Sequence, residues 1–130
     1  MGGSLVEYAE QRRFPRMSVS DASYGVRFQV EGRAIEGARL ANLSASGCGL
    51  EVQMAEVRYL DTGVVLEQFY LDHPDLPYVP LQASVVRILG KVAGKTHGYA
   101  LVGVEFSLIT GFVQGLIHEH VSACLVEVES

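Results

Sequence analysis

The chain has 130 residues and a formal net charge of -5, with 48% hydrophobic and 19% charged residues. This length and composition suit one globular domain and exclude both a disordered chain and two ordinary domains. The acidic balance, with a sequence pI near 5.3, excludes the broad basic surface that binds DNA or RNA backbones, so no nucleic-acid partner is expected.

The sequence carries no recognisable membrane segment. Its apolar runs fall short of the ~20 residues needed to span a bilayer, so membrane insertion is not expected. Cys48 and Cys124 have neither CxxC nor metal-ligand spacing; we expect two reduced, buried thiols and a cytoplasmic protein. Residues 1–10 show little periodicity and are predicted to be a flexible leader or linker, which leaves residues 11–130 as the domain.

Three arginines lie within five residues at the start of this domain, at Arg12, Arg13 and Arg16. Pro15 prevents a helix through the cluster, because it lacks a backbone N–H and restricts Phe14 to extended geometry. In an extended segment Arg12 and Arg16 point to the same side, and Arg13 points to the other. The cluster therefore predicts an arm that presents two guanidinium groups to one target, with Arg13 in a secondary position.

Residues 23–106 alternate between apolar and polar side chains in short runs, which predicts six β-strands. The first two strands form a hairpin around Glu31 and Gly32. Proline and aspartate mark residues 72–77 as a loop, and residues 90–98 form a further connection. The predicted strands cover residues 23–30, 33–43, 48–53, 63–71, 79–89 and 99–106.

Apolar residues recur at helical spacing after the sixth strand, which predicts an amphipathic helix over residues 110–124 with Thr110 as its N-cap. Short strands joined by tight turns indicate an all-β fold, either an antiparallel barrel or a sandwich, on which this C-terminal α-helix packs. The apolar side chains of the helix are Phe112, Leu116, Ile117, Val121 and Cys124.

A second polar cluster, Asn42 to Gly47, lies at the end of the second predicted strand. Asn42 can donate and accept hydrogen bonds on a base edge, and Ser44 can reach a phosphate or a base nitrogen. Gly47 would let the backbone approach a ligand, where a side chain would collide or would be strained at positive φ. Arginine forks suit phosphate oxygens and the O6/N7 edge of guanine. The two clusters together therefore predict a site for a guanine nucleotide.

The two clusters fit the patterns RxxxR and (D/N)xSxxG. In this order and separation they resemble the signature of the PilZ domain family, receptors for cyclic di-GMP. The resemblance implies a six-stranded antiparallel β-barrel with a C-terminal helix, and cyclic di-GMP as the ligand. In the family, the residue before the first arginine influences whether one ligand or a stacked pair binds; here it is Gln11, which leaves the stoichiometry open. The implied ligand-binding residues are Arg12, Arg16, Asn42, Ser44 and Gly47.

The resemblance also implies a non-enzymatic effector with no cofactor beyond this ligand. Ligand binding would order the arm around residues 11–17 and change the surface shown to a protein partner, with motility or exopolysaccharide production among the outputs. One alternative is an adaptor of the same fold that acts without nucleotide. Another is the output domain of a longer flagellar-brake or polysaccharide-synthesis protein.

Two histidines, His118 and His120, raise the question of a metal or acid–base site. Two residues apart on a helix, they diverge by about 200°, unlike the i, i+4 pair of a zinc-binding helix. We interpret them as polar helix surface, and we expect neither a catalytic nor a metal site. The strand aromatics are not grouped with lysine or arginine, so they are expected in the core and not in a base-stacking groove.

Overall fold

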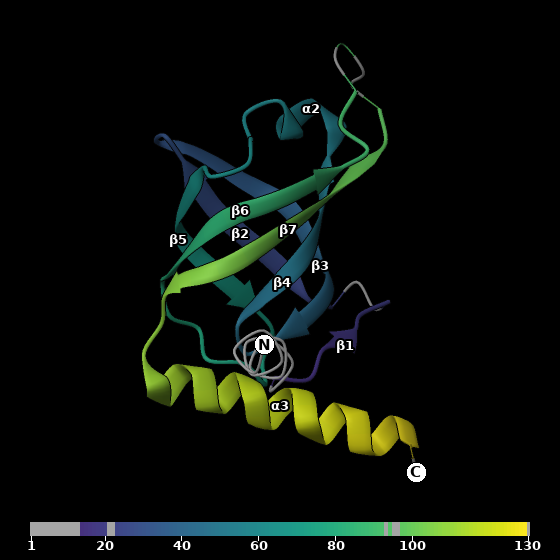
Figure 1. Ribbon diagram of the computed structural model, residues 1–130, viewed down its shortest axis with the longest axis vertical. Helices are drawn as coiled ribbons and strands as arrows, with labels where there is room; N and C mark the ends of the chain where they lie inside the picture. Colours follow the sequence, from purple (N-terminus) through teal and green to yellow (C-terminus); the bar gives the residue numbers. More distant parts are fainter. Residues whose placement is uncertain (1–13, 21–22, 93, 95–96, 130) are drawn as a thin grey trace, which may run out of the picture.

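The computed structural model describes residues 14–20, 23–92, 94 and 97–129, with side chains as far as Val126. Within these residues the chain forms seven strands and two helices (Figure 1). In chain order they are β1 (Met17–Ser18), β2 (Gly25–Val30), β3 (Arg33–Ser44), β4 (Gly47–Gln53), α2 (Met54–Val57), β5 (Val65–Asp72), β6 (Leu81–Leu89), β7 (Tyr99–Leu108) and α3 (Gly111–Glu129).

Six of the strands close into a barrel. The hydrogen-bonded order is β3-β2-β5-β6-β7-β4, and β4 pairs back onto β3. Every one of these pairings is antiparallel. The predicted six-stranded antiparallel barrel is confirmed over the sandwich, and closure leaves none of the six strands with a free edge.

Alternating apolar side chains fill the barrel. Val26, Phe28 and Val30 on β2 are buried, as the period of two predicts, and so are the corresponding apolar positions of β4 and β7. The rings of Phe28 and Phe69 stack with their centroids 5.8 Å apart at the centre of the interior. Residues Glu31 and Gly32, with φ of 50° and 80°, form the tight turn predicted between β2 and β3.

The two helices lie at opposite ends of the barrel (Figure 1). The single turn α2 closes one end with the buried side chains of Met54 and Val57. At the other end α3 crosses the barrel mouth. Two of its own side chains, Ile117 and Val121, are fully buried. The Val113 N–H donates to Thr110 Oγ1 at 3.2 Å, so the predicted N-cap is confirmed.

The structure corrects three details of the predicted elements. Strand β1 and helix α2 were not predicted, since each is too short to show a period. Phe112, assigned to the apolar set of the helix, is 76% exposed. The buried stripe runs through Ile117 and Val121, and four residues back from Ile117 it reaches Val113 and not Phe112. No helix of the described residues is long and apolar enough to cross a membrane.

Candidate functional site

The arginine arm and the second polar cluster meet on the barrel wall. Arg16 Nη1 donates a hydrogen bond of 2.9 Å to Asn42 Oδ1, across 26 residues of sequence. The contact is solvent-exposed, and among the described residues no carboxylate lies within ion-pair distance of Arg16. The guanidinium therefore keeps most of its donors available. Among the described site residues, these two are the pair from different motifs that the structure brings into direct contact.

Strand β1 determines where Arg16 lies. Met17 pairs with Leu43 and Ser18 with Asn42, and the Val19 N–H continues the pairing by donating to the Ala41 carbonyl at 2.9 Å. Because Met17 is buried and 6% exposed, it anchors the arm in the core while Arg16 points to solvent. In this structure the arm is therefore docked on the barrel from Phe14 onward, and its ordering by ligand stays a prediction.

Phe14 links the same arm to α3. Its ring meets the His118 ring edge-on, with centroids 5.8 Å apart and planes at 68°. The turn between β3 and β4 also touches the helix, since Gln114 Nε2 donates to the Ala45 carbonyl at 3.2 Å. Both halves of the candidate site thus contact α3.

Ser44 is not presented to solvent. It is 1% exposed, its hydroxyl accepts from the Ser46 N–H, and it donates to the Gly47 carbonyl, both at 3.3 Å. These bonds close the tight turn between β3 and β4. In this structure the Ser44 hydroxyl thus has a turn-forming role, and its contact with a phosphate or base nitrogen stays a prediction.

The requirement for glycine at position 47 has its cause inside the barrel. A Cβ at Gly47 would lie 2.2 Å from the Val104 carbonyl oxygen and 3.1 Å from Glu105 Cα. Gly47 is not at positive φ, so backbone strain is not the reason. Strand β7 occupies the space that a side chain at position 47 would need, and the approach of this backbone to a ligand stays a prediction.

Sequence reasoning missed a row of residues beside Asn42. Asn42 pairs with Gly49, Gly49 with Gly103, and Gly103 with Arg87, across strands β3, β4, β7 and β6. A Cβ at Gly49 would lie 2.5 Å from Asn42 Nδ2, so this glycine makes room for the Asn42 side chain. The signal in the sequence that could have found this row is a glycine inside each of two predicted strands, Gly49 and Gly103, because a glycine within a strand often marks a close approach of another group.

The thiol beneath the site responds to both burial and Arg16. Burial raises the pKa of Cys48 far above its ordinary value, and the positive charge of Arg16 opposes part of that increase. The thiol therefore stays protonated at neutral pH. Cys48 and Cys124 are both free, as predicted, although Cys124 is only partly buried.

Three predicted residues, Gln11, Arg12 and Arg13, lie outside the described part of the chain. The predicted convergence of Arg12 and Arg16 on one side of the arm consequently stays a prediction.

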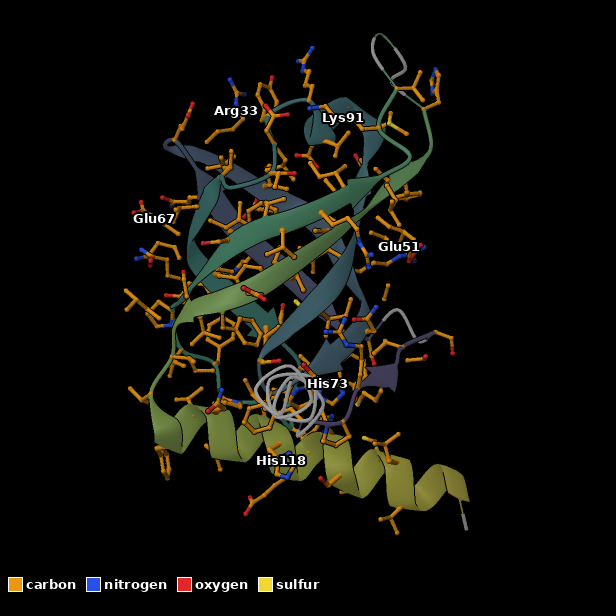
Figure 2. The ribbon with its side chains drawn as sticks, viewed as in Figure 1. Arg33, Glu51, Glu67, His73, Lys91 and His118 are labelled. Carbon is orange, nitrogen blue, oxygen red and sulfur yellow. The ribbon has the colours of Figure 1, made fainter. Side chains whose placement is uncertain are left out.

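The histidines of α3 belong to a helix–barrel contact and not to a polar surface. His120 Nε2 lies 2.8 Å from Tyr24 Oη, and the His73 ring stacks on Tyr24 with centroids 3.9 Å apart. The interpretation of His118 and His120 as exposed helix surface was wrong, because the helix lies flat across the barrel end (Figure 2). Within the described ranges, no group of three His, Cys, Asp or Glu side chains could hold a metal ion.

A closed six-stranded antiparallel barrel, a helix across one end, and an arginine of the N-terminal arm hydrogen-bonded to Asn42 of β3 define the class of protein, a small β-barrel domain with a C-terminal helix. The family model of the PilZ domain matches residues 10–122. The chain belongs to the PilZ domain family.

Solved structures share this fold at low sequence identity. MrkH of K. pneumonia, in its complex with c-di-GMP, is 16% identical with a TM-score of 0.75, over 91% of this chain and 54% of MrkH. The inhibitor of motility MotI/DgrA of Bacillus subtilis is 20% identical with a TM-score of 0.67, over 90% of this chain and 52% of MotI. The PilZ domain of Escherichia coli YcgR, solved with c-di-GMP, is 16% identical with a TM-score of 0.68, over 91% and 94%.

The chain thus spans about half the length of MrkH and MotI and nearly all of the YcgR domain. No curated protein matches the sequence significantly.

Proposed function

We propose that this protein is a non-enzymatic receptor for cyclic di-GMP, with the ligand held between the arginine arm and the end of β3 that carries Asn42. The observation that carries the proposal is the Arg16–Asn42 hydrogen bond, because it puts the two motifs of the family signature on one surface. The c-di-GMP complexes of MrkH and YcgR, which share the fold, support the same ligand class.

The chemistry of this surface suits a guanine dinucleotide. Arg16 offers a planar fork for a phosphodiester or for the O6/N7 edge of guanine, and Arg12 is its counterpart in the family pattern. Asn42 supplies an amide from β3 beside Arg16, while Ser44 and Gly47 hold the turn that follows it. The Asn42 side chain lies over Gly49, and the next position of the row, Gly103, carries no side chain, which leaves room on the wall for a purine ring.

Signalling would proceed through the arm and α3. A ligand that binds Arg16 competes with Asn42 for the guanidinium and favours a different position of the arm. Because Phe14 of the arm contacts His118 and the turn contacts Gln114, that shift changes how α3 sits on the barrel. Ligand then alters the helix surface through its differential affinity for the two positions, and a protein partner detects the change.

Calorimetry with cyclic di-GMP tests the proposal. We expect saturable binding, weakened about tenfold or more in Arg16→Ala and in Asn42→Ala, since a bidentate arginine contact contributes about 1–3 kcal/mol. Arg27→Ala is a matched control: it removes an exposed arginine that stacks on Tyr70 at 4.7 Å on another part of the wall.

The possible outcomes test the receptor function and the location of the site separately. Absence of saturable binding to the wild-type protein would refute the receptor function and favour an adaptor that acts without nucleotide. Binding by Arg16→Ala with wild-type affinity would leave the receptor function intact and refute the site. Titration followed by sizing of the complex gives the stoichiometry that Gln11 leaves open.

A further inference from the structure

A second polar site lies at the end of the barrel closed by α2, opposite α3. Here the turn between β2 and β3 and the segment that follows α2 enclose a pocket of about 920 Å³. Figure 2 shows Arg33 at this end and His118 at the other. The pocket is therefore separate from the surface proposed for cyclic di-GMP.

Two arginines on this pocket hold their charges beside one tyrosine ring. The Cζ atoms of Arg33 and Arg58 lie 4.0 Å and 4.9 Å from the centroid of Tyr59. Arg58 Nη2 also donates to Tyr59 Oη at 2.8 Å. Cation–π contact positions both guanidinium groups but neutralises neither.

Neither arginine has an acidic partner. In the described part of the chain, ion pairs join only Arg39 to Glu51 and Lys91 to Asp61. Asp61 lines the same pocket, but Lys91 Nζ binds it at 3.0 Å and also donates to the Leu60 carbonyl at 2.8 Å. Two like charges held close together without a counter-ion favour an incoming anion, because the anion relieves their repulsion.

The scaffold under these side chains is rigid. Val57 and Leu60, on either side of the two residues Arg58 and Tyr59, are almost completely buried. The Tyr59 N–H donates to the Glu56 carbonyl at 3.1 Å and the Leu60 N–H to the Val57 carbonyl at 3.0 Å. The backbone that carries Arg58 and Tyr59 is therefore anchored before a ligand arrives, which lowers the ordering cost of binding.

We propose that this pocket docks an acidic peptide segment of a protein partner, whose carboxylates bind Arg33 and Arg58 while an apolar side chain packs on Tyr59. Arginine and tyrosine are the residues most enriched in binding hot spots. Glu31 also lines the pocket and forms no ion pair among the described residues. Its negative charge opposes a multiply charged phosphate more strongly than it opposes a singly charged carboxylate, and it offers an acceptor to a backbone N–H of a peptide.

The test is a titration of the ¹⁵N-labelled protein with a short blocked peptide of glutamate and phenylalanine, followed by NMR. We expect saturable shifts confined to residues 31–34 and 57–61. The double variant Arg33→Ala/Arg58→Ala should weaken binding at least about fivefold, as loss of two exposed charge-assisted contacts implies. Arg27→Ala, which removes the same charge elsewhere on the wall, should bind like wild type.

Three outcomes would overturn the proposal. Absence of saturable shifts at these residues would remove the site, and equal binding of a peptide with glutamine in place of glutamate would remove the role of charge. Saturable shifts of the same residues with inorganic pyrophosphate but not with the acidic peptide would make it a phosphate site. Since both arginines are exposed, thermal unfolding of the double variant should match wild type and exclude misfolding as a cause.

Discussion

Replacing Gly47 with alanine is predicted to destabilise the barrel strongly without any contribution from ligand. The added Cβ would lie 2.2 Å from the Val104 carbonyl oxygen and 3.1 Å from Glu105 Cα, and both neighbours are backbone atoms that cannot rotate away. Strands β4 and β7 would have to separate. That separation would also strain the bond from the Phe106 N–H to the Ser46 carbonyl, now 3.0 Å long.

The magnitude follows from these two effects. Overpacking of a tight site costs about 1–3 kcal/mol, and a weakened backbone hydrogen bond adds about 0.5–1.5 kcal/mol. A loss of about 3 kcal/mol is a large part of the ~5–15 kcal/mol that stabilises a domain. For a domain of this size it corresponds to a decrease in Tm of roughly 10 °C.

Gly49→Ala is the matched comparison, measured in the same urea and thermal unfolding experiments. Its Cβ would lie 2.5 Å from Asn42 Nδ2, the end of a side chain that can rotate, so we expect a stability loss below about 1 kcal/mol. The moved amide should instead weaken cyclic di-GMP binding. If Gly47→Ala unfolds at the same temperature and urea concentration as wild type, the steric explanation is wrong.

Two further predictions concern the arm and the buried thiol. Phe14→Ala should release the arm from His118, lower stability by about 1–2 kcal/mol because the ring is only partly buried, and accelerate hydrogen exchange of the Val19 amide; unchanged exchange would contradict this. Because burial raises the pKa of Cys48 in the folded state above its unfolded value of 9.0, the native state retains a proton that the unfolded state loses above about pH 9. Stability should therefore fall with increasing pH by up to about 1.4 kcal/mol per unit more in wild type than in Cys48→Ala, and parallel profiles would refute it.

The barrel was predictable from sequence because its determinants are local. A period of two places Val26, Phe28 and Val30 on one face without reference to any other strand. The same holds for the turn at Glu31–Gly32 and for the Thr110 cap, whose bonding partners lie within three residues. Elements that depend on distant partners were missed: β1 exists because Met17 pairs with Leu43, and two residues show no period.

In the candidate site, too, the features with local determinants were predictable and those that depend on distant residues were not. The residue types of the two motifs indicated their chemistry, and the meeting of Arg16 with Asn42 is consistent with that interpretation. The motif does not reveal which of its members face outward. Ser44 turns inward because the chain reverses there, and Gly47 is required by a carbonyl of Val104, 57 residues later in the chain. Only the register of β4 against β7 contains that information.

A closed barrel limits how such a site can signal. Each barrel strand is hydrogen-bonded on both sides, so the wall cannot shift without breaking several bonds, whereas β1 pairs with β3 at only two positions. The arm is therefore the part that a ligand can move at the lowest cost. It is coupled to α3 because Phe14 packs on His118, and the turn beside it is coupled to α3 because Ala45 accepts a bond from Gln114. A rigid barrel with a lightly attached arm can thus convert binding on its wall into a change at its end.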